Sequence, residues 1–348
     1  MKIIIPSSVI SIGEMVFERC TSLSQIEIPL SVKSIKCFTF YNCISLAQFS
    51  IHSAIESIDY GSFYKCSSLT QIVIPNSVTE LRNDVFHGCS SIVQITLPSS
   101  IVSIGKHAFD GCSSLTNIII PSSVKKIGSY SFWGCSSSTK IEIPSSLTII
   151  DDNTFYLCTS LREVIIPFSV KSIEKNAFYG CSSLGKREIP SSVLTIGSSV
   201  FENCSSLTQV SILSSLTSIS SSTFENCSSL EHIVLPSSIS QIGEDSFKDC
   251  TSLKQIAIPF LVKLIDKNAF YGCKSLTQIE FPSSLESIKS NAFNGCSSLT
   301  QIEIPPSVNS IGYKAFQGCT SLTHRKIPPS VTSISSKAFD GCPSLNNQ

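Results

Sequence analysis

Residues 295–317 read GCSSLTQIEIPPSVNSIGYKAFQ, and the rest of the chain consists of copies of this 23-residue unit. Its phenylalanine, Phe316, recurs every 23 residues from Phe17 to Phe339 without insertion or deletion. Strict self-similarity at a fixed period is typical of a solenoid, in which each unit buries its apolar face against its neighbours. The sequence therefore predicts a single solenoid domain of fifteen repeats over residues 1–348.

The unit alternates apolar and polar residues ahead of Pro305, which is the period-two pattern of a half-buried strand. Ile302 and Ile304 are expected to point inward, and Pro305 to end the strand, since proline donates no hydrogen bond to a ladder. Val308 and Ile311 predict a second, shorter strand with its own inward face. Stacked over the repeats, these strands predict a mostly β fold of parallel sheets.

The stretch around each phenylalanine predicts one short helical or 3₁₀ turn that places the ring in the core. The residue before the phenylalanine is small in every unit, and the second residue after it is most often Gly or Asn. Both tolerate the left-handed conformation that caps a helix. Burying one ring contributes about 1.5–3 kcal/mol, so the phenylalanines are expected to be the main stabilising feature.

Fifteen of the sixteen cysteines share one position, three residues after each phenylalanine. We expect them to form an inward ladder of reduced thiols, because an unbridged cysteine packs as a small hydrophobic residue. The chain has no CxxC pair, so the spacing offers no zinc-ribbon or redox motif. Cys37 alone is out of phase and is expected to be exposed and reactive.

The composition excludes several classes of partner. Charged residues make up only 14% of the chain, the net charge is zero, and Lys and Arg form no long run, so capture of nucleic acid is not expected. No apolar run is long enough to span a membrane, so direct membrane insertion is not expected. Residues 1–6 lack the features of a signal peptide. We therefore expect that the protein stays in the cytoplasm, that it leaves the cell by an unusual route, or that this chain is a piece of a longer one.

No catalytic constellation is expected, and we predict that the chain is not an enzyme and binds no cofactor or metal. The sequence has no nucleophile elbow, P-loop or dinucleotide fingerprint. Its histidines occupy four repeat positions, so they are not expected to converge. The five are His52, His87, His107, His232 and His324.

The unit C-x-S-L-x-x-I-x-I-P-x-S-V-x-S-I-G-x-x-A-F-x-G resembles the BspA-like, or Treponema-type, leucine-rich repeat over essentially all 348 residues. The resemblance implies a right-handed leucine-rich-repeat solenoid, in a family associated with the surfaces of bacteria and mucosal protists, with adhesion to host matrix proteins and with antigenicity. It therefore implies a non-enzymatic protein-binding module, a surface antigen or adhesin. The competing hypothesis is an intracellular scaffold or self-assembling structural protein, which the lack of a signal peptide favours.

The position directly after the phenylalanine is rich in aromatic residues in the first half of the chain and mostly charged or polar in the second. Aromatic side chains are enriched at interface hot spots, so this row is a candidate partner-binding site. The alternative is that each ring lies on the backbone of the next coil. The candidate residues are Tyr41, Tyr64, Trp133, Tyr156 and Tyr179.

An outward row of Gln and Asn on the longer strand is interrupted by Lys140, Glu163 and Lys186. Stacked amides can form a hydrogen-bonded ladder, and this structural interpretation accounts for the Gln row. The charged interruption is a second candidate for a partner site.

Two further features stand out. Arg187 and Arg325 occupy an inward isoleucine position, where an unpaired charge costs several kcal/mol. We expect a local bulge to turn Arg187 outward, with Glu188 as a partner. At the chain ends, the strand at Ile3 and the stop at residues 345–348 leave unpaired edges, so end-to-end self-association is also expected.

Overall fold

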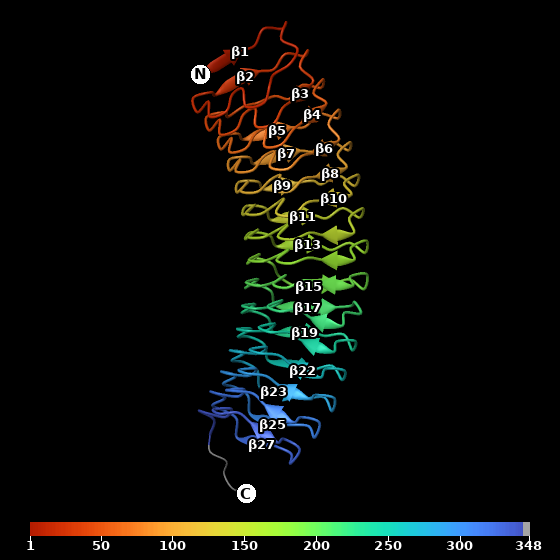
Figure 1. Ribbon diagram of the computed structural model, residues 1–348, viewed down its shortest axis with the longest axis vertical. Coiled ribbons are helices and arrows are strands. Elements are labelled where there is room, and N and C mark those ends of the chain that lie inside the picture. The colour runs from red at the N-terminus through yellow and green to blue at the C-terminus, as the bar shows by residue number, and fades with distance from the viewer. Residues whose placement is uncertain (344–348) are drawn as a thin grey trace. The chain divides into compact units, whose positions relative to one another are not determined.

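The computed structural model describes residues 1–343, and the chain forms a parallel β-solenoid of stacked coils (Figure 1). It divides into two compact units, Met1–Val170 and Lys171–Gln348. In each unit a coil contains a longer strand, a shorter strand and a turn around the repeated phenylalanine. Partner residues in neighbouring strands lie 23 positions apart, as in Gln71↔Gln94, so the repeat sets the register of the sheets.

The first unit contains seven longer and six shorter strands. The longer ones are β1 (Lys2–Ile4), β2 (Gln25–Glu27), β5 (Gln71–Val73), β7 (Gln94–Thr96), β9 (Asn117–Ile118), β11 (Lys140–Glu142) and β13 (Glu163–Ile165). The shorter ones are β3 (Ser34–Ile35), β4 (Ser57–Ile58), β6 (Glu80–Leu81), β8 (Ser103–Ile104), β10 (Lys126–Ile127) and β12 (Ile149–Ile150). Strands β5, β7, β9, β11 and β13 form the largest parallel sheet of this unit.

The second unit repeats this order within its described residues. Its longer strands are β15 (Arg187–Ile189), β17 (Gln209–Ile212), β19 (His232–Val234), β21 (Gln255–Ala257), β23 (Gln278–Glu280), β25 (Gln301–Glu303) and β27 (His324–Lys326). Its shorter strands are β14 (Ser172–Ile173), β16 (Thr195–Ile196), β18 (Ser218–Ile219), β20 (Gln241–Ile242), β22 (Leu264–Ile265), β24 (Ser287–Ile288), β26 (Ser310–Ile311) and β28 (Ser333–Ile334).

The predicted inward and outward faces of the unit are confirmed. Ile302 and Ile304 are buried, as are Val308 and Ile311 on the shorter strand. One coil departs from the pattern, because its longer strand is reduced to a single bridge between Gln25 and Gln48. The ring of Phe49, which follows Gln48, packs edge-on against Phe40 and Phe63, at centroid distances of 5.0 and 4.9 Å.

The phenylalanines form a stacked ladder inside each unit. Their rings are nearly parallel, and neighbouring centroids lie between 5.2 and 5.8 Å apart. Phe109 is fully buried, between Phe86 at 5.8 Å and Phe132 at 5.3 Å. Each ring therefore fills the space between the rings of its two neighbours, which is how the repeat period becomes a continuous core.

The turn around the phenylalanine is where the structure differs from the sequence prediction. Within residues 1–343 it is not helical, and two positions adopt left-handed backbone, for example Tyr130 (φ 62°) and Gly134 (φ 67°) around Phe132. The backbone amides of Tyr130, Phe132 and Gly134 each donate a hydrogen bond to a backbone carbonyl of the next coil. The donor–acceptor distances are 3.0, 3.0 and 2.8 Å, respectively. A helix needs those amides for its own carbonyls, so bonding between coils replaces it. The sequence predicts the left-handed residue at the second position after the phenylalanine, such as Gly134. It does not predict the left-handed residue at the second position before it, such as Tyr130.

The in-phase cysteines lie inward, as predicted. Thirteen cysteines are buried, and none of the sixteen is bridged. The thiols also bond between coils: Cys112 Sγ donates to Phe86 O at 3.2 Å and Cys135 Sγ to Phe109 O at 3.3 Å. The expectation for Cys37 is wrong in degree, because this side chain is half-buried rather than exposed. Its segment packs against the neighbouring coil, with Cys37 O accepting from the Met15 amide at 3.1 Å.

The bulge expected at Arg187 is wrong. Arg187 pairs with Val210 and Ile189 with Ile212, so the register of this strand is regular. The half-buried side chain instead turns its guanidinium back to donate to Lys186 O. A long arginine stem can lie along apolar surface while its charged end reaches the edge. Arg325 instead places its guanidinium over the Phe339 ring, 5.2 Å from the centroid, and donates to Pro343 O at 3.4 Å.

None of the described residues belongs to a helix that could cross a membrane. Strand β1 pairs with β2 on one side, through Ile3↔Ile26. Residues 345–348, which the sequence prediction placed at the opposite edge, lie outside the described residues.

Candidate functional site

The aromatic row of the first unit is a stack of half-buried rings. Tyr41 stacks on Tyr64 at 5.0 Å, and Tyr64 stacks on His87 at 4.3 Å. Trp133 lies 4.9 Å from Tyr156 at a tilt of 59°. Burial raises the pKa of Tyr64. Tyr41, Tyr64 and Trp133 therefore each pack against a ring of the next coil. Asp110 interrupts the row between His87 and Trp133. Tyr179, in the second unit, is also half-buried.

The charged interruption is exposed and only partly contiguous. Lys140 and Glu163 face solvent as register partners on β11 and β13. Lys140 Nζ also lies 2.8 Å from Glu142 Oε1, and this hydrogen bond lowers the pKa of the Glu142 carboxyl. Lys186 is exposed as well, but it belongs to the second unit. The structure thus joins two of the three predicted charges.

The same sheet face carries an apolar row that sequence reasoning missed. Val73, Ile119 and Ile165 point outward beside the Gln row, with exposures of 61%, 79% and 76%. The row is not continuous, because Thr96 lies between Val73 and Ile119, and Glu142 lies between Ile119 and Ile165, as the register partner of Ile165. The signal was present in the sequence, because the outward position held by Glu303 in the quoted unit is Val or Ile in three of the five coils of this sheet. Exposed apolar patches mark interaction surfaces more often than isolated residues do.

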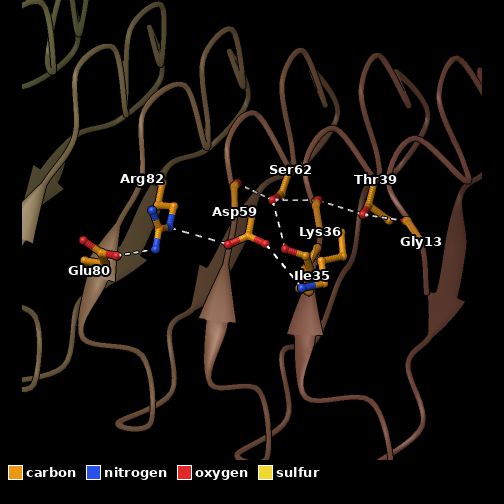
Figure 2. A network of polar contacts seen from close by, with 8 residues as sticks. All are labelled: Gly13, Ile35, Lys36, Thr39, Asp59, Ser62, Glu80 and Arg82. Atoms are coloured by element: carbon orange, nitrogen blue, oxygen red, sulfur yellow. Dashed lines mark hydrogen bonds and ion pairs between the residues drawn. The ribbon is translucent and has the colours of Figure 1, made fainter. Parts of the chain in front are cut away.

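A polar network lies on the shorter-strand side of the first unit (Figure 2). Asp59 lies between Lys36, at 3.9 Å, and Arg82, at 3.5 Å, while Arg82 also contacts Glu80 at 2.8 Å. Behind the charges, the buried Ser62 hydroxyl donates to Lys36 O at 3.2 Å. Half-exposed ion pairs contribute at most about 1 kcal/mol each. We interpret this network as a link between coils rather than a site.

The expectation that no histidines converge is wrong. His87 and His107 belong to adjacent coils, and Asp84 lies near both, with one ligand-type atom of each residue within 4.8 Å of the others. The cause is the turn geometry, because the amide of His87 donates to Asp84 O at 3.2 Å and that of Asp110 to His107 O at 3.3 Å. Each such bond brings the positions two before and one after the phenylalanine together. Repeat positions that look separate in sequence therefore meet in the fold.

Comparisons with known proteins agree with this architecture. The family model described as "BspA type Leucine rich repeat region (6 copies)" matches residues 1–112, 79–208, 171–274 and 240–347. No curated protein matches the chain.

Solved bacterial structures are similar as well. A leucine-rich repeat protein from Bacteroides ovatus is 30% identical, with a TM-score of 0.79 over 98% of this chain and 85% of that one. A leucine rich cell surface protein from Faecalibacterium prausnitzii is 28% identical, with a TM-score of 0.57 over 90% of this chain and 92% of that one. A protein from Eubacterium ventriosum, 21% identical with a TM-score of 0.52 over 94% of this chain and 84% of that one, shares the fold.

Together, the family match over the whole chain, the unbroken 23-residue period and the inward Phe and Cys ladders lead to one conclusion. This chain belongs to the BspA-type leucine-rich-repeat family.

Proposed function

We propose that this chain is a non-enzymatic protein-binding module that docks its partner on the outward face of the longer strands in Met1–Val170. The observation that carries the proposal is the set of exposed apolar side chains Val73, Ile119 and Ile165, which occupy the same outward position in alternate coils. A water-facing row of β-branched side chains gains free energy when a partner covers it, by about 25 cal/mol per Å² of apolar surface buried.

The surroundings of this row support a protein partner. Protein interfaces combine an apolar centre with a polar rim, and Lys140 with Glu163 supplies charges of both signs beside the row. The aromatic row adds Trp133, the single tryptophan of the chain and a residue type enriched at hot spots. Its half-buried, stacked rings are already ordered, so binding loses little conformational entropy there.

The finer proposal is that the chain is a surface antigen or adhesin that binds host matrix or cell-surface proteins. Two observations support it: membership of the BspA-type family, and 28% identity to a Faecalibacterium prausnitzii protein described as a cell surface protein. Labelling intact cells with a membrane-impermeant biotin reagent tests the location. Biotin on the chain before lysis is expected, and labelling only after lysis would remove the adhesin proposal.

Replacing Ile119 and Ile165 together with Asp is expected to weaken partner binding at least about tenfold, because two charges then have to be desolvated at the interface. Binding of the purified chain to immobilised collagen, fibronectin and laminin is measured by surface plasmon resonance. The matched control is Val234→Asp, at the same repeat position and 62% exposed, in the second unit. Equal losses for both variants, or no binding by the wild type to any of the three, would contradict the proposal in this form.

The aromatic row is tested on the same surfaces. Trp133→Ala with Tyr156→Ala is expected to weaken binding more than Glu202→Ala with Glu225→Ala, which occupy the same repeat position in the second unit. Far-ultraviolet circular dichroism confirms that both double variants fold. Equal effects would assign the aromatic row to packing alone.

The competing proposal is self-assembly through strand β1, whose one strand partner among the described residues is β2. The inward Ile3 and Ile5 of this coil are only half-buried, and an unpaired strand edge is a template for another chain. If it holds, residues 1–348 associate with rising concentration in sedimentation experiments, and Ile3→Lys with Ile5→Lys suppresses the association. A monomer at all concentrations would remove this proposal and leave the docking face unaffected.

A further inference from the structure

Two neighbouring turns carry the same pair of side chains in opposite order. One reads DVFH and the other HAFD, 23 residues apart, so each contributes one carboxylate and one imidazole. The coils stack equivalent positions, which places Asp84 next to His107 and His87 next to Asp110. No other pair of consecutive repeats in the sequence has this combination at both positions.

The candidate ligand atoms of this cluster lie near one another. Those of Asp84, His87 and His107 are all within 4.8 Å, and His87 Nδ1 lies 3.9 Å from Asp84 Oδ1 and 3.4 Å from Asp110 Oδ2. A tetrahedral ion with ligand bonds of about 2.0–2.2 Å holds its ligand atoms roughly 3.3–3.6 Å apart, so the three ligands have to move slightly closer together to bind it. His107 Nδ1 lies closer to Asp110 Oδ2, at 2.8 Å, which is a hydrogen bond rather than a shared-ligand distance.

The cluster contains a buried nitrogen without a hydrogen bond. His87 Nδ1 faces the carboxylates of Asp84 and Asp110 but makes no hydrogen bond to either. A buried polar atom without a partner costs free energy, and a metal ion bound to this nitrogen removes that cost. The Asp84 carboxylate beside it is half-buried. A cation nearby would compensate the charge that burial disfavours.

The imidazole rings are held in place by aromatic neighbours. Tyr64 stacks on His87 at 4.3 Å with an interplanar angle of 4°, and Tyr130 stacks on His107 at 4.7 Å and 13°. The carboxylate of Asp110 accepts or shares the proton of His107, which is the support that metal-bound histidines usually have. The ligands are therefore oriented before any ion arrives.

We propose that Asp84, His87 and a ring nitrogen of His107 bind one divalent transition-metal ion, with Asp110 orienting His107. Two imidazoles and a carboxylate select zinc and its neighbours over calcium or magnesium, which prefer all-oxygen sites. The ion would link adjacent coils of the first unit at the aromatic row. The site shares His87 with the aromatic row but includes none of the exposed apolar residues Val73, Ile119 and Ile165.

Calorimetric titration of the chelator-treated full chain with ZnCl₂ tests the proposal. One zinc ion per chain is expected to bind, and the unfolding midpoint is expected to rise by about 2–4 °C at saturating zinc. Because thiols also bind zinc, the titration is repeated after iodoacetamide has alkylated the accessible cysteines. Binding that disappears on alkylation would assign the zinc to thiols and overturn the site.

Substitution locates the ion. His87→Gln and His107→Gln are each expected to reduce zinc affinity at least about tenfold. His232→Gln, a histidine that is 55% exposed beside a single carboxylate 4.0 Å away, is expected to leave it unchanged. Unchanged affinity in both cluster variants overturns the proposal.

A measurement on the wild type covers the case in which a cluster variant does not fold. Zinc is added to ¹⁵N-labelled protein, and the histidine ring nitrogens are followed by NMR. The rings of His87 and His107 are expected to shift together at one equivalent, while those of His52, His232 and His324 stay in place. Shifts of the other rings instead, or of none, contradict the proposal.

Discussion

Phe109→Ala is expected to lower the free energy of unfolding of the first unit by about 3–5 kcal/mol. The ring is fully buried, and its removal leaves a gap between Phe86 and Phe132, which lie 5.8 and 5.3 Å from it. Neighbouring coils cannot close this gap, because their spacing is fixed by the parallel ladders on both strands. Urea unfolding followed by the fluorescence of Trp133, which lies in the same unit, measures the loss.

The matched control is Phe168→Ala. This ring has the same chemistry and lies in the same unit, but it is 71% exposed. Its removal is expected to change the free energy of unfolding by less than about 0.5 kcal/mol. A loss at Phe109 no larger than the loss at Phe168 would show that the ladder is not what stabilises the unit.

Deleting residues 110–132, one whole period, is expected to leave a folded protein, whereas deleting residues 110–121 is expected to unfold the first unit. The first deletion joins Phe109 to Trp133 and preserves every repeat position downstream. The second removes a longer strand and brings Phe132 only eleven residues after Phe109. Phe132 then occupies the repeat position that belongs to the shorter strand, so the inward-facing residues of this coil no longer align with those of its neighbours.

Circular dichroism and the cooperativity of the Trp133 fluorescence transition distinguish the two deletions. The whole-period variant should unfold cooperatively with a slightly smaller urea dependence, since one coil fewer is exposed on unfolding. The half-period variant should show no cooperative transition for this unit. Similar behaviour of the two variants would mean that stacking in register does not determine the fold.

Much of the fold is predictable because many aligned copies of the repeat can be compared, and together they decide between strand and helix where one copy does not. A single short apolar run is ambiguous between strand and helix, but the fifteen aligned copies agree at Phe316 without exception and at Pro305 in all but two. The turn was mispredicted for a physical reason. Whether its amides bond within the turn or to the next coil depends on a neighbour that the local sequence does not contain.

The candidate sites were less predictable. The aromatic row and the Lys140–Glu163 pair follow from repeat position alone, so their placement on shared faces was foreseeable. The His87 and His107 cluster was not, because it joins two different positions through hydrogen bonds that close each turn. Repeat position predicts neighbours along a row, and only the turn geometry predicts neighbours between rows.

The most direct test of this account is a map of thiol reactivity under native conditions, read by mass spectrometry after brief exposure to N-ethylmaleimide. One thiol per coil reports whether that coil turns its cysteine inward. Burial raises the pKa of Cys43 and Cys158 to about 12, so at pH 8 only about one in 10⁴ of these groups is a reactive thiolate.

Modification is expected first at Cys20, Cys37 and Cys342, the three half-buried cysteines, while the thirteen buried ones stay unmodified until the chain unfolds. Rapid modification of many in-phase cysteines in the folded chain would contradict the stacked coil on which the fold, the docking face and the metal cluster all depend.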